Sequence, residues 1–339
     1  MASFLGLCRD AGRLHIVVEC AFRFVERLCR KSTSKFGGSM SHRDIPRQLP
    51  EGFSNPSDRR LGFATVTRYL EIAGKERRYE LFAPTNNDTT KPFPLILAFH
   101  GAGSTPTQFA YVSQLSRRGG RMGYVIAYPA TDGSFWDASA KEGNNDIAFV
   151  RAMLQDITTA IPIDPNRIFA TGMSNGGQMV YTLACEFSER IAAIAVCACG
   201  MRRGGCRPQR AVSVLHFHGT QDPLVPFLWG KDAVSQWIEL DRCAGVPTET
   251  YKNGAAGCLT YSDVATGTAV TMCTVDGMGH QWPGLAIRFS EKETKLLELP
   301  SILSRLGPGT DDLDATGMLL SFFAEHPIRR SADADESKT

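Results

Sequence analysis

Apolar residues recur with two different spacings along this 339-residue chain, and the spacing changes near residue 60. Before it, they recur at helical intervals from Phe4 to Cys29, with the arginines largely off that stripe, which predicts an amphipathic helix. Residues 35–60, rich in Gly, Ser, Pro and charge, are typical of a linker. After it, short apolar runs alternate with amphipathic stretches. We therefore expect a leader and linker over 1–60, a folded domain over 61–328 and a disordered tail over 329–339.

The leader has two interpretations. It is either a membrane-surface or organelle-targeting segment, or else an extra helix packed on the domain or sequence upstream of a true start at Met40. Acidic residues at 10, 19 and 26 count against a transit peptide, which is normally poor in acids. Glu19 also interrupts the apolar stretch that a secretory signal needs, and no small-residue cleavage site follows cleanly. Both interpretations stay open at this point.

The folded part predicts strands and helices in alternation. Two alternating segments flank a turn-like stretch at 74–76, which indicates a hairpin. The predicted strands span residues 64–69, 78–82, 94–99, 123–128, 167–171, 191–196, 212–217 and 270–275. Helices are expected from the Asn144–Asn145 cap to Pro162, and over 178–185, 232–240 and 318–323. This order predicts an α/β domain: a mostly parallel sheet with an N-terminal antiparallel hairpin and helices on both faces.

Composition narrows the function. A net charge of +2 gives no reason to expect nucleic-acid binding, and no apolar run approaches the roughly 18 residues of a transmembrane segment. Ten cysteines hint at disulfides, although their pairing cannot be deduced from the sequence. Three cysteines lie in the leader. Cys185, Cys197 and Cys199 are expected as small core residues, and Cys206, Cys243, Cys258 and Cys273 are the better candidates for bonding.

A serine lies between two glycines in Gly172-Met173-Ser174-Asn175-Gly176, where a buried strand ends and a helix begins. Such a sharp turn exposes the hydroxyl, and flanking glycines tolerate its strained backbone. We therefore predict Ser174 as a nucleophile, since a serine needs both exposure and a base to attack a carbonyl. The alternative is a glycine-rich turn whose serine only caps the next helix.

Two further strand ends supply the partners of a catalytic triad. Asp222 follows one strand in His-Gly-Thr-Gln-Asp-Pro, and His280 follows the last strand within a glycine-flanked loop. The order Ser174, Asp222, His280 is that of an α/β-hydrolase fold. Asp276 is a rival acid, but it lies too near His280 in sequence to come from a separate strand, so we prefer Asp222. For Asp222 the alternative is an ordinary turn aspartate, and for His280 a loop histidine.

The strand that ends at Phe99 leads into His100-Gly101-Ala102-Gly103-Ser104. Backbone N–H groups of Ala102 and of Asn175 are the expected oxyanion hole. His100 is expected to form a local hydrogen bond that shapes this loop. His216 and His218 face the same side of a strand and invite a metal interpretation, but no Cys, Asp or Glu lies nearby with ligand spacing, so no metal is predicted. No phosphate loop or dinucleotide fingerprint is present, so no cofactor is predicted.

These motifs resemble the esterases related to polyhydroxybutyrate depolymerases and to feruloyl and acetylxylan esterases of carbohydrate esterase family one. The resemblance runs from about Arg78 to Pro327. The matching stretches are 78–84, 94–101, 145–150, 172–177, 215–222, 279–284 and 312–316, of which His-Gly-Thr-Gln-Asp and His-Gln-Trp-Pro-Gly are the most specific.

The resemblance implies the same triad, an extracellular location and a disulfide near the histidine loop, for which Cys243 and Cys258 match best. The expected substrates are feruloyl or acetyl esters of plant polysaccharide, and a polymeric ester is compatible with an open cleft.

Phe135, Trp136 and Trp282 are candidate aromatic walls of the substrate site, with plain packing as the alternative. Residues 285–310 are a candidate flap. Alternative functions are a polyhydroxyalkanoate depolymerase, a serine peptidase or acyltransferase, and a non-catalytic binding protein. The sequence indicates no oligomeric state.

Overall fold

The computed structural model describes residues 62–85, 91–202, 206–243, 245–284 and 306–329. The predicted leader and linker, residues 330–339 of the predicted tail, and residues 285–305 of the candidate flap lie outside these ranges.

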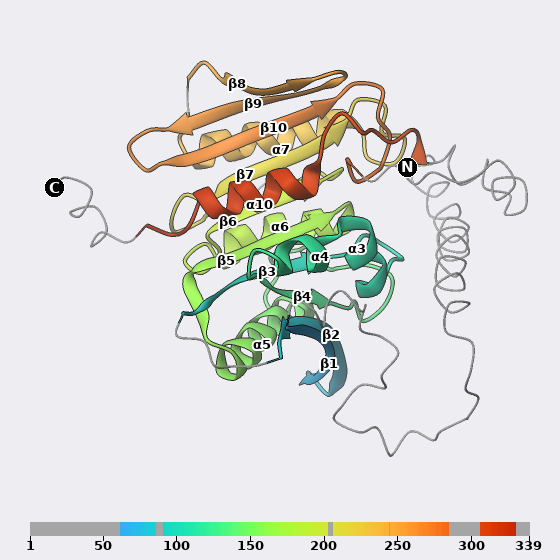
Figure 1. Cartoon of the computed structure of the whole chain (residues 1–339), viewed down its shortest axis with the longest axis vertical. Coiled ribbons are helices and arrows are strands. Elements are labelled where there is room, and N and C mark those ends of the chain that lie inside the picture. The colour runs from blue at the N-terminus through green and yellow to red at the C-terminus, as the bar shows by residue number, and fades with distance from the viewer. Residues whose placement is uncertain (1–61, 86–90, 203–205, 244, 285–305, 330–339) are drawn as a thin grey trace, which may run out of the picture.

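Within these ranges, ten strands form a single sheet in the order β1-β2-β4-β3-β5-β6-β7-β10-β9-β8 (Figure 1). The strands are β1 (Phe63–Ile72), β2 (Lys75–Pro84), β3 (Phe93–Phe99), β4 (Val125–Pro129), β5 (Ile163–Met173), β6 (Ala193–Cys197), β7 (Ser213–Gly219), β8 (Thr248–Asn253), β9 (Ala256–Asp263) and β10 (Thr268–Val275). The helices are α3 (Pro106–Ser113), α4 (Leu115–Gly120), α5 (Asn145–Ala160), α6 (Asn175–Glu186), α7 (Phe227–Leu240) and α10 (Ala315–Glu325).

The centre of the sheet is parallel and its edges are antiparallel. Strands β4, β3, β5, β6, β7 and β10 run in one direction, so their carboxyl ends share one edge of the sheet. The N-terminal hairpin β1–β2 joins β4 in antiparallel fashion, as predicted. The predicted α/β-hydrolase fold is thereby confirmed.

A second antiparallel pair, β8–β9, extends the sheet beyond β10 and was not predicted. Its outermost strand, β8 (Thr-Glu-Thr-Tyr-Lys-Asn), has five exposed residues and no run of alternating apolar side chains. The short helices α3 and α4 were also missed. Because α4 contains two glycines and α3 begins at a proline, neither carries a strong periodic signal.

Helices cover both faces of the sheet and enclose two apolar cores. One core is formed with α5, α6 and α7, and includes Phe149, Met179 and Trp237. The other is formed with α3, α4 and α10, and includes Phe109 and Phe323. Figure 1 shows α10 and α4 in front of the strands and α6 and α7 behind them. Among the described residues, no helix is both long and apolar enough to cross a membrane.

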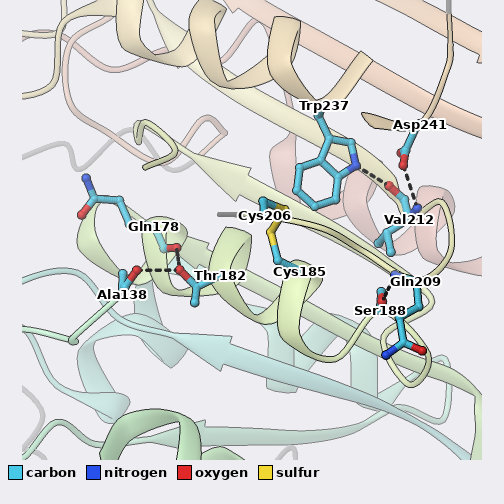
Figure 2. Close-up of a disulfide and its surroundings, with 10 residues drawn as sticks. All are labelled: Ala138, Gln178, Thr182, Cys185, Ser188, Cys206, Gln209, Val212, Trp237 and Asp241. Carbon is cyan, nitrogen blue, oxygen red and sulfur yellow. Dashed lines mark hydrogen bonds between the residues drawn. A yellow bond between two sulfur atoms is a disulfide. The ribbon is translucent and has the colours of Figure 1, made fainter. Parts of the chain in front are cut away.

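Two disulfides differ from the expected pairing. Cys258 bonds Cys273, directly opposite it on the neighbouring strand, with the Cα atoms 4.0 Å apart. Cys185, which was expected only as a core residue, bonds Cys206 and ties α6 to the segment before β7 (Figure 2). Cys243 is a buried free thiol, so the expected pair of Cys243 with Cys258 is wrong. Cys197 and Cys199 are buried free thiols, as predicted for core residues.

The C-terminal end of α7 buries a carboxyl group. Asp241 is 3% exposed and accepts a hydrogen bond from the N–H of Val212 at 3.2 Å, while Trp237 Nε1 donates to the Val212 carbonyl at 2.7 Å (Figure 2). Burial raises the pKa of Asp241 to about 7, although the hydrogen bond from Val212 acts in the opposite direction. This carboxyl therefore holds its proton more tightly in the folded chain than in the unfolded chain.

We expect the stability contributed by this proton to be complete below about pH 4 and to be lost as the pH rises through about 7. Asparagine is always neutral, so Asp241→Asn should be more stable than the wild type at pH 8, by on the order of a few kcal/mol in the free energy of unfolding, and should melt at a higher temperature. At pH 4 the two proteins should melt at nearly the same temperature. Thermal melts at pH 4, 6 and 8 measure this. Glu239→Gln, at an exposed position of the same helix, is the control. A less stable Asp241→Asn protein at pH 8 would contradict the prediction.

Candidate active site

Ser174 occupies the turn between β5 and α6. Its φ is 56° and its ψ is −126°, a conformation that non-glycine residues rarely adopt. Its N–H donates to the carbonyl of Cys197 at 2.9 Å, which fastens the turn to the end of β6. The predicted strand–turn–helix context of the serine is present.

The glycines on either side of Ser174 are required by space. A Cβ on Gly172 would lie 2.6 Å from the carbonyl oxygen of Gly176. A Cβ on Gly176 would lie 2.3 Å from the carbonyl oxygen of Phe99 and 2.4 Å from that of His100. The turn therefore passes directly against the carboxyl end of β3. This contact brings the serine beside the predicted oxyanion loop.

Asp222 and His280 form the hydrogen-bonded pair that the sequence predicted. Nδ1 of His280 lies 2.8 Å from Oδ2 of Asp222, and both residues are buried. Because a carboxylate oxygen only accepts, Nδ1 carries the hydrogen and Nε2 is left to act as a base. The other carboxylate oxygen accepts from the N–H groups of Leu224 and Val225, at 2.9 and 2.8 Å.

Burial acts to raise the pKa of Asp222, but hydrogen bonds from His218 and His280 outweigh it and hold this pKa well below its ordinary value. The carboxylate is therefore ionised over the whole physiological range. The rival acid Asp276 instead accepts a hydrogen bond from the hydroxyl of Thr220, at 2.8 Å. Among the described residues, the partner of His280 is thus Asp222, and no hydrogen bond joins His280 to the hydroxyl of Ser174. Catalytic hydrogen bonds are often long without a substrate and tighten when it binds.

The loop after β3 is shaped by His100. Its Nδ1 donates to the carbonyl of Gly101 at 2.8 Å, and the N–H of Ser104 donates to the same carbonyl at 3.1 Å. Burial lowers the pKa of His100 to about 4, so the ring is neutral at pH 7. The predicted local role of His100 is confirmed.

This arrangement fixes the direction of the amide of Ala102. The peptide bond from Gly101 to Ala102 is trans, so its N–H points away from the carbonyl that His100 and Ser104 hold. A Cβ on Gly101 would lie 3.4 Å from Cβ of Ser174, so the loop and the serine are neighbours. The N–H of Asn175 begins α6 and has no helical carbonyl to bond.

The predicted aromatic walls turn out differently. Trp136 and Trp282 are each only 3% exposed. Nε1 of Trp136 donates to the carbonyl of His100 at 2.9 Å, and Nε1 of Trp282 donates to the hydroxyl of Thr316 at 3.0 Å. Both indoles therefore pack in the interior, where Trp136 meets the ring of Phe99 and Trp282 that of Phe109, each edge to face. Phe135 is 62% exposed and is the one of the three that presents a ring to solvent.

The side chain of Asn175 braces the site in a way that the sequence did not reveal. Its Oδ1 accepts from the N–H of Trp136 at 2.6 Å, and its Nδ2 donates to the carbonyl of the same residue at 3.2 Å. Behind this loop, the buried pair of Arg77 and Asp146, at 2.7 Å, holds the N–H of Asp137, also at 2.7 Å. Asn175 lies 39 residues from Trp136 in the sequence, and Arg77 lies 69 residues from Asp146, so no short motif indicates either contact.

A surface pocket of about 270 Å³ adjoins the loop from His100 to Ser104. Its wall includes Arg78, His100, Ser104, Thr105 and Thr131. Within the part of the chain that the structure describes, no group of three or more His, Cys, Asp or Glu side chains is arranged to hold a metal ion.

The strand order and the serine turn define the class: this is an α/β-hydrolase fold. Residues 136–255 match the family model described as Phospholipase/Carboxylesterase. The chain is 27% identical to feruloyl esterase B of Piromyces equi over 222 residues, and this alignment covers 58% of this chain and 41% of that protein. It is 30% identical over 192 residues to feruloyl esterase D of Neurospora crassa, which covers 53% and 64%.

The chain thus spans less than two thirds of the length of either relative. Among solved structures, the acetyl xylan esterase from Aspergillus awamori aligns with a TM-score of 0.53 at 16% identity, over 69% of this chain and 99% of that chain, and shares the fold. The predicted resemblance to carboxylic ester hydrolases of the α/β-hydrolase fold is therefore confirmed.

We expect Gly176→Ala to displace the Ser174 turn, because its Cβ would collide with two backbone carbonyl oxygens that cannot rotate away. The free energy of unfolding should fall by about 1–3 kcal/mol or more, as for other overpacked sites, and ester hydrolysis should fall with it. Gly257→Ala is the matched control, since its Cβ would meet a flexible lysine side chain at 3.6 Å and the carbonyl oxygen of Tyr251 at 3.8 Å, both at ordinary van der Waals distance. Urea unfolding and a turnover assay compare the two variants, and equal behaviour of both would refute the steric argument.

Proposed function

We propose that this chain is a serine esterase that hydrolyses carboxylic esters with Ser174, Asp222 and His280 as its catalytic triad. The observation that carries the proposal is the buried hydrogen bond between Asp222 and His280, at the same sheet edge as the strained serine. The similarity to feruloyl esterases supports the same activity.

The proposed reaction is a two-step acyl transfer. Nε2 of His280 takes the proton of the Ser174 hydroxyl as its oxygen attacks the ester carbonyl. Asp222 holds the tautomer of His280 and stabilises the imidazolium that forms. The amides of Ala102 and Asn175 bind the oxyanion. His280 then protonates the leaving alcohol, and a water molecule, activated by the same imidazole, releases the acid.

The proposed substrates are feruloyl or acetyl esters of plant polysaccharide. The similarity to two feruloyl esterases favours a hydroxycinnamoyl acyl group. Phe135 offers an exposed ring beside Trp136, whose backbone is tied to Asn175, so an aromatic acyl group has a surface to stack on close to the serine. The two disulfides favour an oxidising, extracellular location as part of this proposal.

Ser174→Ala should lower kcat/KM for methyl ferulate by at least about 10⁴-fold, because it removes the nucleophile. A fluorophosphonate probe should label the wild type and leave the variant unlabelled. Ser262→Ala, at an exposed position on β9, is the control and should behave as wild type. The same assay with p-nitrophenyl acetate, 3-hydroxybutyrate oligomers and peptide amides distinguishes the ester classes from a peptidase. Labelling that persists in Ser174→Ala would overturn the proposal.

The identity of the acid has its own test. Asp222→Asn should lower kcat by on the order of 10⁴-fold, because an amide no longer fixes the productive tautomer of the imidazole. Asp276→Asn removes the rival carboxylate and should leave kcat within about twofold, since Asp276 bonds Thr220 rather than His280. Initial rates at saturating substrate measure both. The opposite ranking of the two variants would assign the role to Asp276.

A further inference from the structure

A second layer of polar side chains lies behind Asp222. The hydroxyl of Tyr181 is 2.8 Å from Nδ1 of His216, and Nε2 of His216 is 3.1 Å from Nδ1 of His218. Nε2 of His218 is 3.0 Å from the carbonyl of Val225 and 3.5 Å from Oδ2 of Asp222. Tyr181, His216 and His218 are each at most 1% exposed. We call these three residues the histidine chain.

The acceptors at one end of the histidine chain fix its direction. Both partners of Nε2 of His218 are oxygens that can only accept, so this nitrogen carries a hydrogen. In a neutral imidazole the other nitrogen is then an acceptor, so Nδ1 of His218 must receive a hydrogen from Nε2 of His216. Nδ1 of His216 must in turn accept from the hydroxyl of Tyr181. Every hydrogen bond therefore points from Tyr181 towards Asp222.

Burial, and then the neighbouring His218, lower the pKa of His216 well below its ordinary value, so the ring of His216 is neutral at pH 7. The other titratable groups around it are Asp222, His280 and the thiols of Cys197 and Cys199. Burial raises the pKa of both thiols, whereas hydrogen bonds from His218 and His280 hold the pKa of Asp222 well below its ordinary value, so Asp222 is charged at pH 7 and the thiols are neutral.

Helix α7 seals the histidine chain from solvent. A Cβ on Gly230 would lie 2.3 Å from Nδ1 of His218 and 2.8 Å from Nε2 of His216, so the helix backbone rests directly on the bond between the two rings. The two imidazoles are nearly parallel, with 7° between their planes. Because both rings are buried, Nε2 of His216 and Nδ1 of His218 have no water as an alternative partner. Reversing the tautomer of one ring would therefore leave buried polar groups without a hydrogen bond.

We propose that Tyr181, His216 and His218 are positioning residues, whose one-way hydrogen bonds keep the Nε2–H of His218 on the Val225 carbonyl and on Oδ2 of Asp222. This inference rests on the proposed function, because Asp222 matters to catalysis only as a member of the triad. His218 steadies the segment from Asp222 to Val225 and shares Oδ2 with His280. Without His218, Oδ2 of Asp222 would interact with His280 alone and would stabilise the imidazolium form of His280 more strongly.

The first test is the protonation of each ring in the wild-type protein. Imidazole ¹⁵N chemical shifts distinguish protonated from bare nitrogen, and single His→Gln variants assign the signals. Between pH 6 and 8, Nε2 should be protonated and Nδ1 bare in both His216 and His218. A hydrogen on Nδ1 of either ring, or on both nitrogens of His218, would overturn the proposal. Because this test needs no turnover, it stands even if Ser174 proves not to be a nucleophile.

The second test separates positioning from packing. In His216→Leu the donor to His218 is lost, and kcat/KM for methyl ferulate should fall by about tenfold, with the acidic limb of its pH profile moved to higher pH. His216→Gln places an amide N–H where Nε2 was, so it should recover to within about threefold and restore the limb. His326→Gln, whose ring bonds the Phe322 carbonyl on α10, is the control. If a folded His216→Leu protein keeps the acidic limb of the wild-type pH profile, the histidine chain contributes packing alone and the proposal is wrong.

Discussion

The turn at Ser174 lies so close to the end of β3 that no methyl group fits between them. This contact sets the distance between the serine and the loop from His100 to Ser104, and the rest of the site is built around it. The serine keeps a strained backbone because α6, β6 and β3 hold it from three sides. A side chain anywhere in this contact would widen the gap and would move the serine turn away from the end of β3.

Polar groups around this contact are arranged in connected sets rather than single pairs. Trp136 joins the His100 carbonyl to the side chain of Asn175, so hydrogen bonds connect the loop from His100 to Ser104 with the serine turn. On the other side, Asp222 receives hydrogen bonds from its own turn and from His280. Buried networks of this kind are rigid when every member is satisfied, and rigidity is what a site needs to hold reacting groups in place.

Much of this could be predicted from the sequence, because the information was local. Apolar runs bounded by glycines gave the central strands, and parallel strands bring Ser174, Asp222 and His280 to one edge. What failed depended on tertiary contacts. The partner of Cys258 follows from strand register across β9 and β10, and β9 itself was not predicted. Nothing in the sequence around Trp136 and Trp282 shows that their rings are buried against Phe99 and Phe109. The histidine chain needed the position of Val225 and Asp222 before its direction could be assigned.

The outermost strand, β8, ends the sheet with threonine, glutamate, lysine and asparagine side chains in place of an apolar row. An unpaired strand edge is a template on which another chain can add, and charged, hydrophilic residues make that addition unfavourable. The weak periodicity that hid β8 from prediction thus has a physical benefit. It discourages intermolecular strand pairing, and with it aggregation, on the flank of the molecule beyond β10.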